Sequence, residues 1–174
     1  MMNFQIKETT GYTPKIGELV SMLDYTRAVT LEDVKGLSTE QLDFLADEHS
    51  NSIGALILHM AAIEYIHQII AFENRDLTEQ ELETWIVPFE LGSKARSKIC
   101  NQPLEYYIGE LAAVREKTLA LMKGVEDDWL YEEGQYYNGV TYNKYYLWFH
   151  VVEDETSHRG QIRMLKRMLD NRKN

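Results

Sequence analysis

The sequence predicts an all-α protein built as a four-helix bundle. Four segments of about 15 to 28 residues repeat apolar side chains every three or four positions, as the buried face of an amphipathic helix does. No segment alternates apolar and polar residues as a half-buried strand would. A chain of 174 residues can bury a sizeable core, so we expect a single domain over residues 1–174, without a linker or internal repeat.

The first helix is expected to begin with Thr13 as its N-cap and Pro14 at its first position, and to weaken near Thr30. Ser38 and Gln41 match a capping box, which predicts a short helical turn after the first helix. The buried face of the first helix is expected to carry Ile16, Leu19, Val20, Leu23 and Thr26 or Arg27.

The second helix is expected to start at residues 49–52 and to end at about Asn74. A histidine interrupts its apolar face, where such a residue is more often a hydrogen-bonded core side chain than a metal ligand. Glu64 lies well off this face and is expected in solvent. His67 lies at the edge of the face and could at most contact a metal-binding side chain without binding the metal itself. The face itself consists of Ser52, Leu56, His59, Ile63, Ile66 and Ile70.

A long crossover is expected between the second and third helices of the bundle. Thr78 and Glu81 form a second capping box, which opens a short helix that is expected to end before Pro88. Residues 89–102 are expected to form the rest of this connection. The third helix is predicted over residues 103–123.

The fourth helix is predicted over Tyr142–Leu169, with Thr141 as a possible cap after a loop over residues 127–139. At about 100° per residue, the centre of its apolar stripe lies close to His158, with Asp154 about 40° to one side. The stripe runs through Leu147, Val151, Asp154, His158, Ile162, Leu165 and Leu169.

Asp154 and His158 need a partner, because an isolated charge inside an apolar stripe is costly. The two lie one turn apart, so they either bind a metal ion or form a buried hydrogen bond between two helices. His59 repeats the same feature on the second helix, and the three residues together predict a two-histidine, one-carboxylate metal site. Three protein ligands leave a position open for water or substrate, as in catalytic zinc sites. Imidazole and carboxylate suit Zn²⁺, Ni²⁺, Fe²⁺ and Mn²⁺ alike, so only a divalent ion is predicted.

His150 competes for a place in this site, because it also lies one turn from Asp154. It is about 80° from the centre of the stripe, so we expect it outside the ligand set, with replacement of His158 as the alternative. Glu153 and Glu155 fall on other faces of the helix and are expected in solvent.

The composition limits the partners of the protein. A formal charge of −10 argues against binding to nucleic acid or to an anionic membrane. No run of 18 apolar residues could span a membrane, and the N-terminus lacks the pattern of a signal peptide. The single cysteine, Cys100, has no second cysteine to pair with, which suits a reducing compartment. We therefore expect a cytoplasmic protein.

Aromatic residues gather around the start of the fourth helix. They could line a cleft near one end of the bundle, or they could pack in the core or in an oligomer contact. The group consists of Tyr136, Tyr137, Tyr142, Tyr145, Tyr146, Trp148 and Phe149.

Two motifs resemble the DinB/YfiT-like superfamily of metal-binding four-helix bundles. They are Asn51-Ser-Ile-Gly54 followed by His59, and His150-Val-Val-Glu-Asp-Glu-Thr-Ser-His158-Arg-Gly-Gln-Ile162. The helix order and length also fit, so the resemblance covers nearly the whole chain. It implies that three histidines bind the metal, at the positions of His59, Asp154 and His158. Asp154 stands where the family has histidine, which could favour a harder ion such as Mn²⁺ or Fe²⁺ or leave the site degraded and empty.

The resemblance also implies a function. Related proteins are thiol S-transferases that use bacillithiol, mycothiol or glutathione, thiol-dependent isomerases, or proteins labelled metal-dependent hydrolases, and many are homodimers. We therefore expect a metal-dependent enzyme that transfers a low-molecular-weight thiol to an electrophile or hydrolyses a small substrate. The alternative is a non-catalytic bundle whose metal is structural or absent, acting as a dimeric stress-related binding protein.

Overall fold

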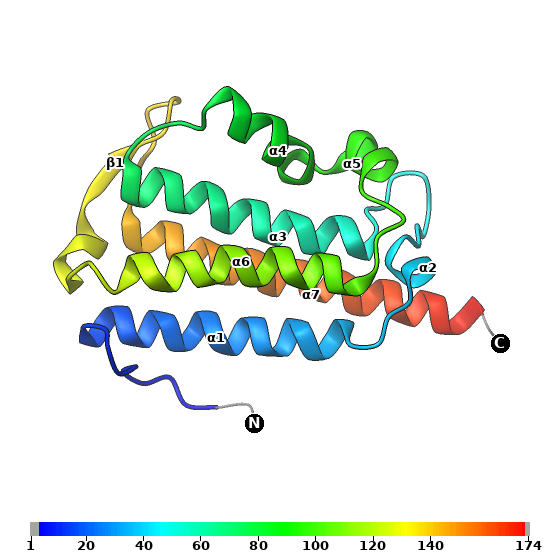
Figure 1. Ribbon diagram of the computed structural model, residues 1–174, viewed down its shortest axis with the longest axis horizontal. Coiled ribbons are helices and arrows are strands. Elements are labelled where there is room, and N and C mark those ends of the chain that lie inside the picture. The colour runs from blue at the N-terminus through cyan, green and yellow to red at the C-terminus, as the bar shows by residue number, and fades with distance from the viewer. Residues whose placement is uncertain (1–3, 173–174) are drawn as a thin grey trace.

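The structure is a computed structural model that describes residues 4–172, and within that range four long helices form a bundle (Figure 1). α3 packs against both α6 and α7, and α1 packs against α7. In Figure 1, α1 and α7 run in one direction and α3 and α6 in the other. The predicted all-α bundle is confirmed. Its helices are α1 (Pro14–Val34), α3 (Ile53–Gln68), α6 (Leu104–Met122) and α7 (Lys144–Arg172).

α3 is the central helix, and every residue from Ser52 to Glu64 is buried. The helix continues into a π-helical turn, η1 (Ile69–Glu73), which ends at Asn74 in a left-handed conformation with φ of 49°. By length and composition, the segment Ile53–Glu73 could also cross a membrane, but 78% of its apolar window is buried inside the protein. Its hydrophobicity is therefore explained by its place between the other helices.

The connection between α3 and α6 contains two further helices, α4 (Glu79–Glu90) and α5 (Gly92–Lys98), and α4 packs along α3. The expectation that α4 ends before Pro88 is wrong, because Pro88 lies inside its last turn. The proline lacks one backbone N–H and so costs this helix a hydrogen bond. The packing of α4 on α3, where Pro88 is buried, outweighs that local cost.

The predicted loop over residues 127–139 is more ordered than expected. It contains a 3-10 helix, η2 (Asp127–Tyr131), and a strand, β1 (Glu133–Gln135), which pairs antiparallel with β2 (Thr141–Asn143). Thr141 therefore belongs to a strand and does not cap α7. Instead, Oδ1 of Asn143 accepts a hydrogen bond from the N–H of Tyr146 at 2.8 Å. Strands of three residues are too short for an alternating pattern to be recognised.

The start of α1 is capped from a distant part of the chain. Thr13 is its N-cap residue, as predicted, but the Thr13 side chain donates to Oδ1 of Asp127 and does not cap the helix itself. The same oxygen accepts from the backbone N–H groups of Lys15 and Ile16. The carboxylate of η2 therefore supplies the cap and ties the start of α1 to the segment that follows α6.

Four charged side chains, one from each bundle helix, meet in the core. Nε of Arg115 lies 2.6 Å from Oε1 of Glu64, and Nη2 of Arg27 lies 2.9 Å from Oε2 of Glu64. Nε of Arg27 also lies 3.1 Å from Oε1 of Glu155. The hydroxyl of Thr118 donates a further hydrogen bond to Glu64. We call Arg27, Glu64, Arg115 and Glu155 the buried ion network.

The expectations that Glu64 and Glu155 face solvent are wrong. Their exposed fractions are 0% and 2%. Burial alone would raise the pKa of Glu64, but Arg115 and Arg27 outweigh burial and hold it below its usual value. The partners come from α1 and α6, so the face of a single helix could not reveal them. Glu153, by contrast, is exposed as expected.

Gly54 allows the ring of Tyr107 on α6 to lie directly against the backbone of α3. A Cβ atom at position 54 would lie 2.6 Å from Cζ of the fully buried Tyr107, far inside van der Waals contact. Gly54→Ala is therefore expected to lower the free energy of unfolding by about 1 to 3 kcal/mol, despite the higher helix propensity of alanine.

Gly109, exposed on α6, is the matched control, because a Cβ there would have no neighbour within 4 Å. Gly109→Ala is expected to stabilise the protein by about 0.5 to 1 kcal/mol. Urea unfolding of both variants measures the two effects, and effects of the same sign would contradict the close packing at Gly54.

Candidate metal centre

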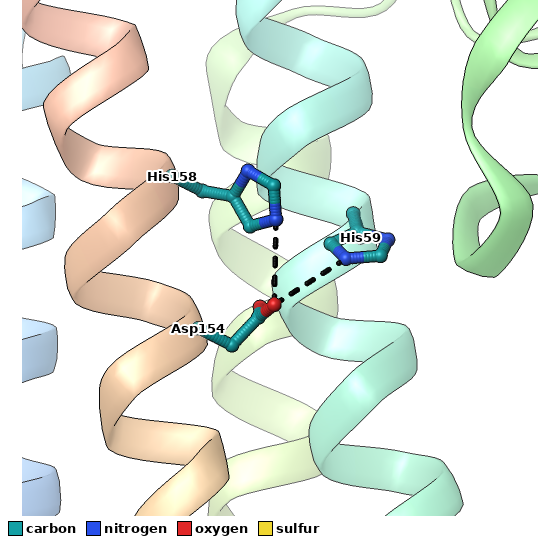
Figure 2. A group of neighbouring side chains, drawn as sticks. All are labelled: His59, Asp154 and His158. Carbon is teal, nitrogen blue, oxygen red and sulfur yellow. Dashed lines mark ion pairs between the residues drawn. The ribbon is translucent and has the colours of Figure 1, made fainter.

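His59 on α3 and Asp154 and His158 on α7 point toward a common position between the two helices (Figure 2). One potential ligand atom from each residue lies within 4.8 Å of the other two. Nε2 of His59 lies 3.5 Å from Oδ1 of Asp154, and Nε2 of His158 lies 3.3 Å from the same oxygen. The structure thus brings together the three residues that the sequence singled out.

His59 is held in one orientation by the end of α4. Its Nδ1 lies 2.9 Å from the carbonyl oxygen of Pro88, which can only accept a hydrogen bond. Nδ1 therefore carries a hydrogen, and Nε2, which faces Asp154, is the ring nitrogen left to bind an ion. The Pro88 carbonyl is available because the N–H of Gly92, one turn later, donates to Oδ1 of Asn51 instead, at 3.1 Å.

The state of the three residues fits a divalent cation. Oδ2 of Asp154 and Nδ1 of His158 are buried and have no hydrogen-bond partner among the described residues, which is uncommon for buried polar atoms. Two imidazoles and one carboxylate form a donor set that several divalent metals accept. The side chains of His59, Asp154 and His158 retain exposed fractions of 10%, 11% and 14%, so solvent can reach the site.

The pKa values of the site follow from the same contacts. Burial would raise the pKa of Asp154, but hydrogen bonds and charge interactions with His158 and His59 outweigh burial and lower it. Burial would lower the pKa of His158, but its contact with Asp154 outweighs burial and raises it. Asp154 is therefore a carboxylate at neutral pH. A cation that binds beside it has to compete with protons for the imidazole nitrogens that face this carboxylate.

A second pair of histidines lies two turns along the same helices. His150 lies outside the three-residue group: its Nδ1 is 3.4 Å from Oε2 of Glu153, and its ring stacks on Tyr146. The centres of the His150 and His67 rings are 5.5 Å apart. Both helices space their histidines eight residues apart, at 59 and 67 and at 150 and 158. This equal spacing indicates that the histidines of the two helices can lie opposite one another, which the pattern of one helix alone does not show.

His67 is buried, with an exposed fraction of 6%, and its Nδ1 lies 2.6 Å from the carbonyl oxygen of Ile63. Burial lowers the pKa of His67 to about 4. The unfolded chain, with a histidine pKa of about 6.5, binds more protons between pH 4 and 6.5 than the folded chain does. Stability is therefore expected to rise with pH across this window and to be fully present above pH 6.5.

Between pH 6.5 and 5, His67 is expected to cost about 2 kcal/mol of stability, which His67→Gln should largely remove. Urea unfolding at both pH values measures this difference. His49→Gln is the control, since the His49 side chain is 86% exposed. An equal acid loss in the wild type and in His67→Gln would contradict a neutral, buried His67.

Comparisons with known proteins give a family and a fold. The model of the family described as mycothiol-S-transferase matches residues 18–171 of the chain. No curated protein matches the chain. A conserved protein from Enterococcus faecalis has a similar structure, with a TM-score of 0.67, 16% identity, and coverage of 88% of this chain and 95% of that one. A protein from Streptococcus pneumoniae gives a TM-score of 0.66, 14% identity, and coverage of 96% and 94%. At these identities the likeness concerns the fold alone.

Proposed function

The chain belongs to the mycothiol-S-transferase family, one of the DinB/YfiT-like families that its motifs indicated, and we propose that it is a divalent-metal-dependent thiol S-transferase. Its reaction joins the sulfur of a low-molecular-weight thiol to a small electrophilic molecule. His59, Asp154 and His158 would hold the ion. The observation that carries this proposal is the convergence of these three side chains, from two helices, within 4.8 Å.

A bound divalent ion would supply a Lewis acid that favours the thiolate form of the sulfur donor at neutral pH. Asp154 would contribute the single negative charge of the site. With a divalent ion the site would therefore keep one net positive charge, which favours the binding of an anionic sulfur. The Pro88 carbonyl orients His59, so this ligand is in place before any substrate binds. In the transfer the S–H bond breaks and its proton passes to solvent, an S–C bond forms, and the bond from that carbon to the leaving group breaks, the leaving group taking the electron pair.

The same three residues would also serve a hydrolase, and a non-catalytic bundle with a structural metal is the alternative of another class. We further propose a cytoplasmic protein, most simply a homodimer, that acts on a small molecule and binds neither nucleic acid nor membrane. The net charge of −10 supports the last point.

Thiol consumption with mycothiol, bacillithiol and glutathione as separate donors tests this function. We expect transfer to an alkylating electrophile with at least one donor, loss of the catalysed rate when the metal is chelated, and recovery when the metal is returned. His59→Ala should abolish the catalysed rate and the exposed control His49→Ala should keep it. A rate that survives both chelation and His59→Ala would contradict the mechanism, and hydrolysis without thiol would favour the hydrolase.

A further inference from the structure

A cleft of about 830 Å³ lies between α3, α4 and the β1–β2 hairpin. Its volume is that of a pocket for a drug-sized molecule. Three of the clustered tyrosines, Tyr136, Tyr137 and Tyr142, line its hairpin end, whereas Trp148 is fully buried in the core. The apolar wall includes Ile66, Ile70, Leu82, Trp85, Ile86 and Phe89.

The cleft begins beside the candidate metal centre. Phe89 lines the cleft, and its ring also stacks on the ring of His59, with centres 6.4 Å apart and planes inclined by 24°. Ile66 on α3 and Ile70 on η1 follow on the same face as His59. A molecule in the cleft can therefore place one end next to the metal ligands while its body lies along α3 and α4.

The aromatic wall of the cleft is fixed in place. The ring of Trp85 stacks on Tyr65, with centres 4.8 Å apart and planes inclined by 19°. The hydroxyl of Tyr65 donates to Oε1 of Glu81 at 2.9 Å, and burial together with this contact raises the pKa of Tyr65 to about 12. Trp85 therefore offers a flat aromatic surface that is already fixed, so binding of a ligand does not cost the conformational entropy of this side chain.

The charges at the cleft disfavour an anion. Arg75 is the only cation among the described residues that line it. Its Nε donates to Glu73, its Nη1 donates to Glu81 and to the carbonyl of Asp76, and its Nη2 donates to Glu81 and lies 2.7 Å from Glu73. These contacts account for all five N–H donors of a guanidinium. Arg75 is thus neutralised by Glu73 and Glu81, and Asp76 adds a carboxylate to the lining of the cleft.

We propose that this cleft binds the electrophile and that it selects an uncharged aromatic one. The inference rests on the proposed function and adds the substrate class. An aromatic ring can pack against Trp85 and Phe89, whereas an anionic substituent would lose its hydration in a cleft whose cation, Arg75, is already neutralised by carboxylates. The electrophilic carbon lies at the Phe89 end. There the thiolate sulfur forms the S–C bond, and the leaving group departs with the electron pair of the broken bond.

The test uses two isosteric, unreactive probes, neutral 4-nitrobenzyl alcohol and anionic 4-(hydroxymethyl)benzoate, titrated by calorimetry into the full-length protein without thiol. We expect the neutral probe to bind at least about tenfold more tightly. Glu73→Gln removes one of the carboxylates that pair with Arg75, so it should reduce the preference for the neutral probe over the anionic one. The exposed control Glu116→Gln should leave this preference unchanged. Leu82→Trp, at a site that is 40% exposed and therefore tolerant, should weaken both probes by filling the cleft.

Binding without thiol does not depend on catalysis, so it can fail or succeed separately from the proposed function. Equal affinity for the two probes, or a Leu82→Trp variant that binds as the wild type does, would overturn the inference. Displacement of the neutral probe by the thiol alone would also overturn it, since the cleft would then belong to the thiol. In the transfer reaction, 4-nitrobenzyl chloride should give a higher kcat/KM than 4-(chloromethyl)benzoate after each is corrected for its uncatalysed rate.

Discussion

Glu64→Gln is expected to lower the free energy of unfolding by about 3 to 5 kcal/mol, because it leaves two buried guanidinium groups with one carboxylate between them. Glu64 has no exposed surface, and both Arg27 and Arg115 lie within 3 Å of it. Glutamine keeps the shape of the side chain, so the loss reports the charge and not a cavity. Chemical denaturation at pH 7 measures the change.

Two further variants test whether the buried ion network acts as a unit. The exposed Glu116→Gln should change stability by less than about 0.5 kcal/mol. Combining Glu64→Gln with Arg115→Met removes one charge of each sign and leaves Arg27 paired with Glu155, so the double variant should be less destabilised than the sum of the single ones. Strict additivity would contradict the coupling of these residues.

The network also matters for the metal centre. Glu155 follows Asp154 in the sequence and lies 3.1 Å from Nε of Arg27, which in turn contacts Glu64 on α3. These contacts fix α7 relative to α3, the two helices that supply the candidate ligands. Loss of the network is therefore expected to loosen the geometry of the site as well as the core.

Asp154→Ala is expected to weaken metal binding by more than about a hundredfold, since loss even of an outer partner of a ligand typically costs tenfold to a hundredfold. His59→Ala should have a similar effect. Asp154→His, which restores the three-histidine pattern implied by the superfamily, should keep the metal and shift its preference from Mn²⁺ or Fe²⁺ toward Zn²⁺. Competition with a chromophoric chelator measures these affinities.

His150→Ala is the matched control for the ligand set. His150 contacts Glu153, Tyr146 and His67, so its loss should change the affinity for metal by less than about tenfold. A loss as large as that of Asp154→Ala would show that His150 is a ligand and that the assignment of His158 is wrong.

The sequence was informative where structure is set locally. The capping boxes at Ser38 and Thr78 formed as predicted, because their donors and acceptors lie within four residues. The convergence of His59, Asp154 and His158 could also be predicted, since each stands on an apolar face that a bundle must turn inward.

The errors at Glu64, at the cap of α1 and at Pro88 involve partners that are distant in sequence. The pattern of its own helix predicts that Glu64 is exposed, because its partner Arg115 lies 51 positions later in the sequence. The cap of α1 comes from Asp127, more than 100 residues away, and Pro88 is tolerated because α4 packs on α3. A periodic pattern describes one helix at a time, so it cannot reveal these pairings.

The central claim is that His59, Asp154 and His158 hold one divalent ion. The most direct test is anomalous diffraction at the metal absorption edge, from crystals of protein purified without a metal-affinity tag, together with elemental analysis of the same sample. We predict about one equivalent of ion per chain and a single anomalous peak between these three side chains. Ordered side chains with no peak, or a peak beside His67 and His150, would contradict the claim.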